Sequence, residues 1–471
     1  MRPMMPTQRM KIKKGGARMR PFSTAELAKA THGIANGDAV ITNVVIDNRE
    51  VVKDSLFIAI KGERLDGHRF IPAAVEAGAT AIMCHKPVEC AVPTVQVQDT
   101  TQAFLDLAHY YRKEFSIPFV ALTGSVGKTT TKEMIACVLS AKYNTHKTYK
   151  NWNNEIGLPK VLLGLAPAHE AAVIELGMNH KGEISRLSKT AEPDIGVITN
   201  IGVSHIENLG SREGILAAKL ELLDGMKPGS PLFLNADNDL LSTVTRDDFA
   251  IHHFGIHNPA EVMAKDLDYQ AAHTVFTAVT PAGTCRVTLP TTGEHNVYNA
   301  LAAISVGLAL DIPLEQAAKA LEDYIPAGMR EHIVEKGGIT FIEDCYNASP
   351  DSMKALATTL SIMGDGKRKI AVIADMLELG NYSETAHRQA GGYMADAGTD
   401  LLMTYGENSK FAAAEAKAHG MVRVFDFDKK EDLTEKLISL LHPGDVVAFK
   451  GSRGMELEEV IQKVYESLDR S

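Results

Sequence analysis

Residues 120–134, with the sequence VALTGSVGKTTTKEM, join a short apolar run to a glycine-bracketed loop and then to a helical stretch that opens on Lys-Thr-Thr. This order predicts a buried strand, a loop whose backbone holds phosphate, and a helix N-terminus directed at the same phosphate. Further along, apolar runs such as AAVIEL and IGVITNIG alternate with helical stretches such as REGILAAKLELLDGM. Such alternation is typical of a mostly parallel sheet covered by helices, so we expect an α/β fold.

The predicted phosphate loop is a shorter variant of the common form, because Leu122 stands where the longer form has glycine. We expect Lys128 to reach the β- and γ-phosphates and the Thr129 hydroxyl to ligate Mg²⁺. A plain glycine turn before a helix is the alternative, and the ordered strand, loop, Lys-Thr pair and helix argue against it. The predicted phosphate-binding residues are Gly124, Ser125, Val126, Gly127, Lys128, Thr129 and Thr130.

Two further side chains follow buried runs in the same topological position as the loop. Glu175 ends AAVIEL, and His205 comes after VITNIG. In open parallel sheets, ligands bind beyond the carboxyl ends of the strands, so Thr129, Glu175 and His205 are predicted to form one metal–phosphate site. Taken singly, Glu175 and His205 are equally well explained as ordinary polar loop residues. The prediction of a metal–phosphate site rests on their joint placement at the ends of predicted strands.

Lys219 lies on an apolar helical stripe, four residues after Ile215 and shortly before Leu222 and Leu223. One interpretation is a lysine at the edge of the stripe whose ammonium reaches water. The other is a desolvated lysine, which loses its charge and becomes a reactive amine. A reactive amine at this place would suit carbamylation by CO₂, which would create an anionic group near Mg²⁺.

The length of 471 residues suggests about three domains. Residues 1–21 carry seven Lys or Arg and no acid, and are predicted to be a disordered basic leader. Residues 22–115 mix short β-like runs with helical patterns, which indicates a small α/β domain, and residues 116–326 form the predicted central phosphate-loop domain. Beyond IPAGMR, residues 327–471 restart a clean βα alternation, which predicts a doubly wound, Rossmann-like third domain.

Charge and composition exclude some classes of protein. The formal net charge of −10 argues against a general nucleic-acid binder. No apolar run approaches the roughly 18 residues needed to span a bilayer, so no integral membrane contact is expected. The five cysteines show no C-x-x-C spacing and are predicted to be reduced thiols of a cytoplasmic protein.

From about residue 22 onward the chain resembles the Mur ligases, the ATP-dependent amide-forming enzymes of peptidoglycan precursor synthesis. The motifs that carry the resemblance follow in order: TGSVGKTTTKEM, NNEIGLP, ELGMNHKGEI, GEHNVYNALAA, DCYNASPDSM, IADMLELG and KGSRGMELEEV. Three of them, NNEIG, ELGMNHKGEI and DCYNASPDSM, resemble the member that adds D-alanyl-D-alanine to UDP-N-acetylmuramoyl-tripeptide. The D-N-P-R signature of the relative that adds the third amino acid is not found in the sequence.

The resemblance implies roles for individual residues. Lys128 and Thr129 would clamp the triphosphate of ATP and its Mg²⁺, with Glu175 and His205 as further metal ligands, and Lys219 would be carbamylated. The implied catalytic residues are Lys128, His205 and Lys219. The ATP site would also include Asn154, Asn296, Asn299, Arg330, Asp344 and Asn347. The UDP-linked substrate would be held by Asn48, Arg49, Asp66, Gly67 and His68.

The implied protein is a cytoplasmic monomer whose partners are UDP-N-acetylmuramoyl-tripeptide and D-alanyl-D-alanine. A sister ligase, which adds another amino acid or extends folate with glutamate, is the nearest alternative, although a UDP-like first domain argues against folate. A phosphate-loop regulatory NTPase is a second alternative, and NADN at 235–238 does not supply its guanine-reading N-K-x-D. A binding protein that has lost catalysis is a third, and intact Lys128, Glu175, His205 and Lys219 argue against it.

Overall fold

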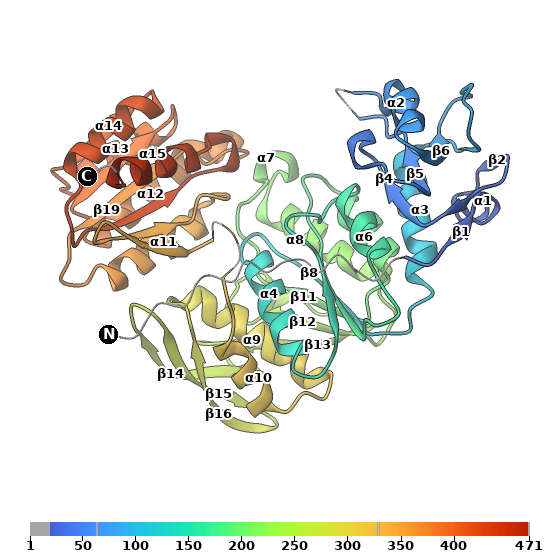
Figure 1. Ribbon diagram of the computed structural model, residues 1–471. Coiled ribbons are helices and arrows are strands. Elements are labelled where there is room, and N and C mark those ends of the chain that lie inside the picture. Colours follow the sequence, from blue (N-terminus) through green and yellow to red (C-terminus); the bar gives the residue numbers. More distant parts are fainter. Residues whose placement is uncertain (1–18, 63–64, 327, 329, 470–471) are drawn as a thin grey trace, which may run out of the picture. The chain divides into compact units, whose positions relative to one another are not determined.

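The computed structural model describes residues 19–62, 65–326, 328 and 330–469. It forms two compact units (Figure 1): the first covers the described residues up to Ser116 together with Glu155–His169, and the second covers Ile117–Asn154 and the chain from Glu170 onward. The basic leader predicted for residues 1–21 lies outside the described residues, apart from its last three. Of these, Arg20 forms ion pairs with Glu26 and Glu114.

The first unit is built around a small sheet in the order β2-β7-β6-β5-β4, in which only β2 runs antiparallel to its neighbour. Its central strands β5 and β6 are mostly apolar and buried, apart from the half-buried Thr80 of β6, which agrees with the β-like runs of the sequence. The strands are β2 (Ile34–Asn36), β4 (Asn43–Val45), β5 (Ser55–Ile58), β6 (Ala79–Cys84) and β7 (Thr94–Gln96), with a separate pair β1 (Phe22–Ser23) and β3 (Val40–Ile41). The helices are α1 (Thr24–Thr31), α2 (Ile71–Glu76), α3 (Thr100–Arg112) and α5 (Gly157–Leu163).

In the described part of the second unit, nine strands form one sheet in the order β16-β15-β14-β13-β12-β11-β8-β10-β9. Pairing is parallel from β9 to β14, and β14, β15 and β16 form an antiparallel extension, which is the strand-rich section of the sequence. The strands are β8 (Phe119–Thr123), β9 (Thr145–Lys147), β10 (Ala171–Glu175), β11 (Ile195–Ile198), β12 (Pro231–Asn235), β13 (Ala250–Gly255), β14 (Val262–Tyr269), β15 (Thr274–Thr280) and β16 (Gly283–Leu289). The covering helices are α4 (Lys128–Leu139), α6 (Glu183–Ala191), α7 (Ile206–Leu209), α8 (Arg212–Leu220), α9 (Glu294–Ala309) and α10 (Leu314–Glu322).

Strand β8 places the phosphate loop at the centre of this sheet, between β11 and β10. Val120 and Leu122 of β8 are fully buried in the core that α4 and α9 share with the sheet. Leu122, which stands where the longer loop has glycine, is therefore a core residue, and the loop begins only at Gly124. The short variant of the motif is explained by a strand that continues two residues further.

The C-terminal part of the second unit carries its own sheet, in the order β17-β18-β22-β19-β20-β21, parallel except for the β17–β18 hairpin (Figure 1). Its strands are β17 (His332–Lys336), β18 (Ile339–Glu343), β19 (Lys369–Ala374), β20 (Leu401–Tyr405), β21 (Val424–Phe427) and β22 (Val446–Lys450). Helices cover both faces: α11 (Pro350–Met363), α12 (Ser383–Asp396), α13 (Ser409–Ala418), α14 (Lys430–Leu440) and α15 (Glu458–Leu468). Separate apolar cores on the two faces of this sheet match a doubly wound arrangement, and the predicted α/β fold class is confirmed.

Among the described residues, no helix combines the length and the apolar character that crossing a bilayer requires.

Candidate functional site

A cavity of about 660 Å³ lies in the second unit, where the phosphate loop faces residues of the C-terminal six-stranded sheet. One wall consists of the loop from Ser125 to Thr130, with Glu175 and His205 beside it. The opposite wall comes from the first turns of α9 and α11. Polar groups from several elements line this cavity, and its size suits a nucleotide and a second substrate together.

The phosphate loop is held from behind by the end of β11. The backbone N–H of Ser125 donates to the Asn200 carbonyl at 3.1 Å, and the N–H of Val126 donates to the Asn200 side chain at 2.9 Å. The Thr199 hydroxyl donates to the Val126 carbonyl at 2.7 Å. These bonds orient the loop, so that the N–H groups of the first turn of α4 are directed toward the cavity.

Both glycines of the loop are required by close packing. A Cβ atom on Gly124 would lie 1.9 Å from the Thr199 hydroxyl oxygen. Gly127 has a φ of 79°, and a Cβ there would lie 2.8 Å from the Asn299 side-chain oxygen. No residue with a side chain fits either position without moving these neighbours.

Lys128 opens α4 and folds back across the loop, with its ammonium donating to the Gly124 carbonyl at 2.8 Å. Burial lowers the pKa of Lys128, and the nearby Arg330 lowers it further, while the carboxylate of Glu175 opposes both. A buried cation at the mouth of a phosphate loop stabilises bound polyphosphate, because opposite charges attract strongly where water is excluded.

Glu175, at the end of β10, is held in place by three side chains. The Thr129 hydroxyl donates to its Oε2 at 2.8 Å, and the Asn153 amide donates to its Oε1 at 2.7 Å. The ammonium of the fully buried Lys132 lies 3.9 Å from Oε2. Hydroxyl and carboxylate oxygens side by side next to a phosphate loop form the donor set that Mg²⁺ prefers, with phosphate oxygens and water completing its octahedron.

His205 lies just beyond β11 and lines the same cavity. Its Nδ1 is 2.7 Å from Oε2 of Glu378, which belongs to the C-terminal sheet layer. Among the described residues, no three His, Cys, Asp or Glu side chains converge into a preformed metal cage. Thr129 and Glu175 therefore fit Mg²⁺ as partial ligands, and the role of His205 as a further ligand stays a prediction.

Lys219, in α8, is almost completely buried, with 2% of its surface exposed. No carboxylate in the described part of the chain forms an ion pair with it. Burial lowers the pKa of Lys219 well below its usual value, and the positive charge of Lys128 acts in the same direction. The lowered pKa favours the neutral amine, which is the form that reacts with CO₂.

The two asparagines of α9 connect the phosphate loop to the linker between the sheets. The Asn299 side chain accepts from the Thr131 hydroxyl at 2.8 Å and donates to Asn296 at 3.3 Å. The Asn296 amide donates to the Thr292 carbonyl at 2.9 Å and to Glu331 at 2.7 Å. Both predicted residues therefore belong to one buried network beside the cavity.

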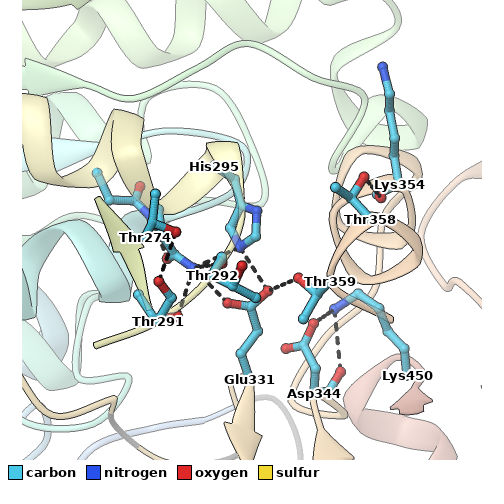
Figure 2. Close-up of polar contacts among 12 residues, drawn as sticks. Thr274, Thr291, Thr292, His295, Glu331, Asp344, Lys354, Thr358, Thr359 and Lys450 are labelled. Atoms are coloured by element: carbon cyan, nitrogen blue, oxygen red, sulfur yellow. Dashed lines mark hydrogen bonds and ion pairs between the residues drawn. The ribbon is translucent and has the colours of Figure 1, made fainter. Parts of the chain in front are cut away.

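Figure 2 shows Glu331 at the centre of that network, with His295 and Thr359 directed at its carboxylate. The His295 Nε2 lies 2.7 Å from Oε1 of Glu331, and the Thr359 hydroxyl donates to the same oxygen at 3.1 Å. Burial opposes protonation of His295, but the Glu331 carboxylate outweighs it and raises the pKa of His295. The pKa of Glu331 is correspondingly lowered, despite burial.

Residues of the C-terminal part complete the cavity wall. Asp344 forms an ion pair with the buried Lys450, and burial raises the pKa of Asp344 against the effect of that ammonium (Figure 2). The guanidinium of Arg330 lies 4.0 Å from the centre of the Tyr346 ring, which fixes its plane at the cavity. Asn347 lines the cavity and accepts from the Ala348 N–H at 2.9 Å.

The structure thus gathers most predicted site residues at one cavity. Gly124, Asn154 and Lys219 are not among the lining residues. Asn154 is exposed, whereas its neighbour Asn153 lines the cavity and binds Glu175. The residues that sequence reasoning missed include Lys132, which lies one helical turn after Thr129, and Glu331. The spacing of Lys132 is a usable signal, but nothing in the sequence around Glu331 indicates its partners.

The predicted UDP-substrate residues lie in the first unit and are described there alone. Asp66 accepts from the His68 N–H at 3.0 Å and from its Nδ1 at 2.7 Å, and burial lowers the pKa of His68. A Cβ on Gly67 would lie 2.6 Å from the Ile60 carbonyl oxygen, so the turn requires glycine. Asn48 and Arg49 form a short 3₁₀ turn in which the largely exposed guanidinium pairs with Asp47.

Comparison with known families matches most of the chain in three segments. Residues 40–112 match the "Mur ligase family, catalytic domain", residues 122–307 match the "Mur ligase middle domain", and residues 329–453 match the "Mur ligase, glutamate ligase domain". The residues around the cavity fall within the second and third segments, except Tyr324 and Pro326, which lie between them.

Curated relatives and solved structures agree over nearly the full length. The UDP-N-acetylmuramoyl-tripeptide–D-alanyl-D-alanine ligase of Bacillus subtilis is 41% identical over 94% of this chain and 97% of its own, and that of Escherichia coli is 34% identical over 94% and 98%. A crystal structure of MurF from Acinetobacter baumannii superposes with a TM-score of 0.89 at 33% identity, over 95% of this chain and 99% of that one. The MurF ligase of Thermotoga maritima in complex with ADP gives 0.83 at 27% identity, over 91% and 98%.

Proposed function

The chain belongs to the Mur ligase family, and from that premise we propose that it adds D-alanyl-D-alanine to UDP-N-acetylmuramoyl-tripeptide in peptidoglycan precursor synthesis. It is an ATP-binding acid–amino-acid ligase. The observation that carries this conclusion is the cavity in which the phosphate loop meets residues of the C-terminal sheet, in a chain that resembles such ligases over nearly its whole length.

The first chemical step activates a carboxylate. A carboxylate is a poor electrophile, so one oxygen of the tripeptide's terminal carboxylate attacks the γ-phosphorus of ATP, and ADP leaves as an acyl phosphate forms. Lys128 and the N–H groups at the start of α4 stabilise the charge on the transferring phosphoryl group. Asn296, Asn299, Arg330 and Asn347, which line the cavity, are proposed to hold the nucleotide. A role for Asn154, which lies outside the lining residues, stays a prediction.

The proposal includes Mg²⁺, held by Thr129 and Glu175 with His205 as a third ligand. When bound, the ion neutralises phosphate charge and orients the triphosphate for transfer. The chain itself prepares this site, because Asn153 and Lys132 hold the Glu175 carboxylate in one orientation. These oxygen donors fit the preference of a hard cation.

Carbamylation of Lys219 is also part of the proposal. The neutral amine would attack CO₂, form a C–N bond and release one proton, which leaves an anionic carbamate on the side chain. The charge of Lys128 lowers the pKa of Lys219, and the same charge would attract an anionic carbamate on Lys219.

The second step forms the amide. The amine of D-alanyl-D-alanine attacks the acyl phosphate, and phosphate leaves from the tetrahedral intermediate. Asp344, which forms an ion pair with the buried Lys450, is proposed to close on the nucleotide. The nine-stranded and six-stranded sheets with their helices are proposed to exclude water from the reacting groups. The two steps together require the nucleotide, the tripeptide carboxylate and the attacking amine to be aligned.

The first unit is proposed to hold the UDP part of the substrate through Asn48, Arg49, Asp66, Gly67 and His68. The proposed domains are residues 22–115, 116–326 and 327–471. The enzyme is proposed to be cytoplasmic, since it depends on ATP and its five cysteines are free thiols, as in reducing compartments. It is also proposed to act as a monomer.

The test follows ADP release with Mg²⁺-ATP and UDP-N-acetylmuramoyl-tripeptide, with and without D-alanyl-D-alanine, and detects the pentapeptide product by mass. Lys128→Met serves as the inactive control. ADP release and product that both require the dipeptide support the proposal. ADP release that ignores both substrates would indicate a regulatory NTPase, and turnover only with a single amino acid would indicate a sister ligase.

A further inference from the structure

His205 and Glu378 join the two sheet layers of the second unit through one short contact. His205 follows β11 of the nine-stranded sheet, and Glu378 lies between β19 and the short 3₁₀ turn Gly380–Tyr382 of the six-stranded sheet. The His205 Nδ1 is 2.7 Å from Glu378 Oε2. Only 18% of the His205 side chain is exposed, against 54% for Glu378.

Both residues of this contact have an uncommon backbone conformation. His205 has a φ of 62° and Glu378 a φ of 63°, in the left-handed region that residues with a side chain rarely adopt. Such conformations cost free energy, and they persist where the surrounding structure enforces them, often at functional sites.

The segment around His205 is packed onto the C-terminal layer. Val203 and Ile206 contact the apolar core of that layer. A Cβ on Gly380 would lie 3.3 Å from the Cβ of Glu207, so the two loops touch along their backbones. The position of His205 therefore depends on the presence of the C-terminal layer beside it.

The contact determines which nitrogen of His205 is available to ligands. A neutral imidazole whose Nδ1–H donates to a carboxylate presents the lone pair of Nε2. His205 lines the cavity, whereas Glu378 does not belong to the lining residues. Nε2 is thus the nitrogen left for the cavity, and carboxylates that hold a histidine in this way set both its tautomer and its orientation.

We propose that Glu378 is a positioning residue: it fixes the Nδ1–H tautomer and the ring orientation of His205, so that docking of the C-terminal layer completes the phosphoryl-transfer site. This inference rests on the proposed ligase function. Its consequence is that ATP is used only when the two layers are docked. An ordinary half-exposed ion pair, by contrast, contributes about 0–1 kcal/mol to stability and leaves catalysis unchanged.

The kinetic test compares Glu378→Ala and Glu378→Gln with a matched control, Glu384→Ala. Glu384 lies in the same layer, is similarly exposed and pairs with Arg388. We expect Glu378→Ala to lower kcat by about 10- to 100-fold with little change in the KM for ATP. Glu378→Gln, whose amide oxygen accepts the same hydrogen, should retain most of the activity, and Glu384→Ala should match the parent.

A double-mutant cycle separates positioning from structure. If Glu378 acts through His205, adding Glu378→Ala to His205→Ala produces no further loss of kcat. An additive loss in the double variant, or equal loss in Glu378→Ala and Glu384→Ala, would overturn the inference.

A spectroscopic measurement on the nucleotide-free protein gives a readout independent of activity. Isotopic labelling of histidine nitrogens, with His205→Ala as the assignment reference, reports the tautomer of His205 by NMR. We expect the Nδ1–H form in the parent and a mixture of tautomers in Glu378→Ala. An unchanged tautomer would refute the inference, whereas a parent enzyme that makes no pentapeptide would refute the proposed function instead.

Discussion

Replacing Lys219 by methionine is expected to stabilise the protein while it abolishes ligase activity. Lys219 is buried without a carboxylate partner among the described residues, and burial together with Lys128 lowers its pKa well below the usual value. Methionine fills a similar volume and needs no desolvation of an amine. The native lysine is therefore a cost to folding, kept where its chemistry is required.

The magnitude follows from proton linkage. An unfolded lysine holds its proton up to a pKa of about 10.4, whereas burial and the nearby Lys128 lower the pKa of Lys219 well below that value in the folded protein. Between the two pKa values the unfolded state binds more protons, so stability rises with pH by up to about 1.4 kcal/mol per unit. Between about pH 7 and about pH 9, the free energy of unfolding of the parent is therefore expected to rise relative to that of Lys219→Met. The advantage of the variant is thus largest at the lower pH.

The assay is urea unfolding in CO₂-free buffer, followed through the single tryptophan, Trp152, for the parent and Lys219→Met across that pH range. Using the difference between the two proteins cancels all other titrating groups. Parallel pH dependences would refute the reasoning, because they would mean that Lys219 keeps its proton in the folded protein. Restoring bicarbonate should change the parent and leave the variant unaffected.

Three further outcomes are expected from the site geometry. Thr129→Val removes the hydroxyl that donates to Glu175 and should weaken Mg²⁺-ATP binding roughly 10- to 100-fold by calorimetry; unchanged affinity would contradict its role. Gly202→Ala would place a Cβ 2.0 Å from Asp351 Oδ2, and because this carboxylate must rotate away from the loop, kcat should fall by less than about 10-fold with ATP affinity retained; a loss of activity above that would mean that α11 itself is displaced. Chelation of Mg²⁺ should stop ADP release and added Mg²⁺ should restore it; turnover that survives chelation would exclude the proposed metal site.

The sequence of residue types along the chain was enough to predict the phosphate loop and the sheet around it. The apolar run before Gly124 predicts a buried strand, and the Lys-Thr pair after Gly127 predicts the start of a helix. The structure has both elements, as β8 and α4. Glu175 was predicted from its place at the end of an apolar run, because strand ends of a parallel sheet share one edge. Lys219 was ambiguous in sequence, and only its three-dimensional burial separates the two interpretations.

Contacts between distant segments could not be predicted in the same way. Glu331 follows a boundary recognised by its proline and glycine, yet its partners His295 and Thr359 lie 36 and 28 residues away on different helices. The pairing of His205 with Glu378 spans 173 residues and two sheets. No periodicity or local propensity encodes such contacts, which depend on how whole layers pack.

The central claim is that the bound phosphate activates a carboxylate for amide formation. The most direct test uses UDP-N-acetylmuramoyl-tripeptide with heavy oxygen in its terminal carboxylate and analyses the released phosphate by mass spectrometry. Transfer through an acyl phosphate moves one labelled oxygen atom from the carboxylate into each phosphate as the amide forms. Unlabelled phosphate released together with product would mean that water, not the carboxylate, attacks ATP, and it would contradict the account.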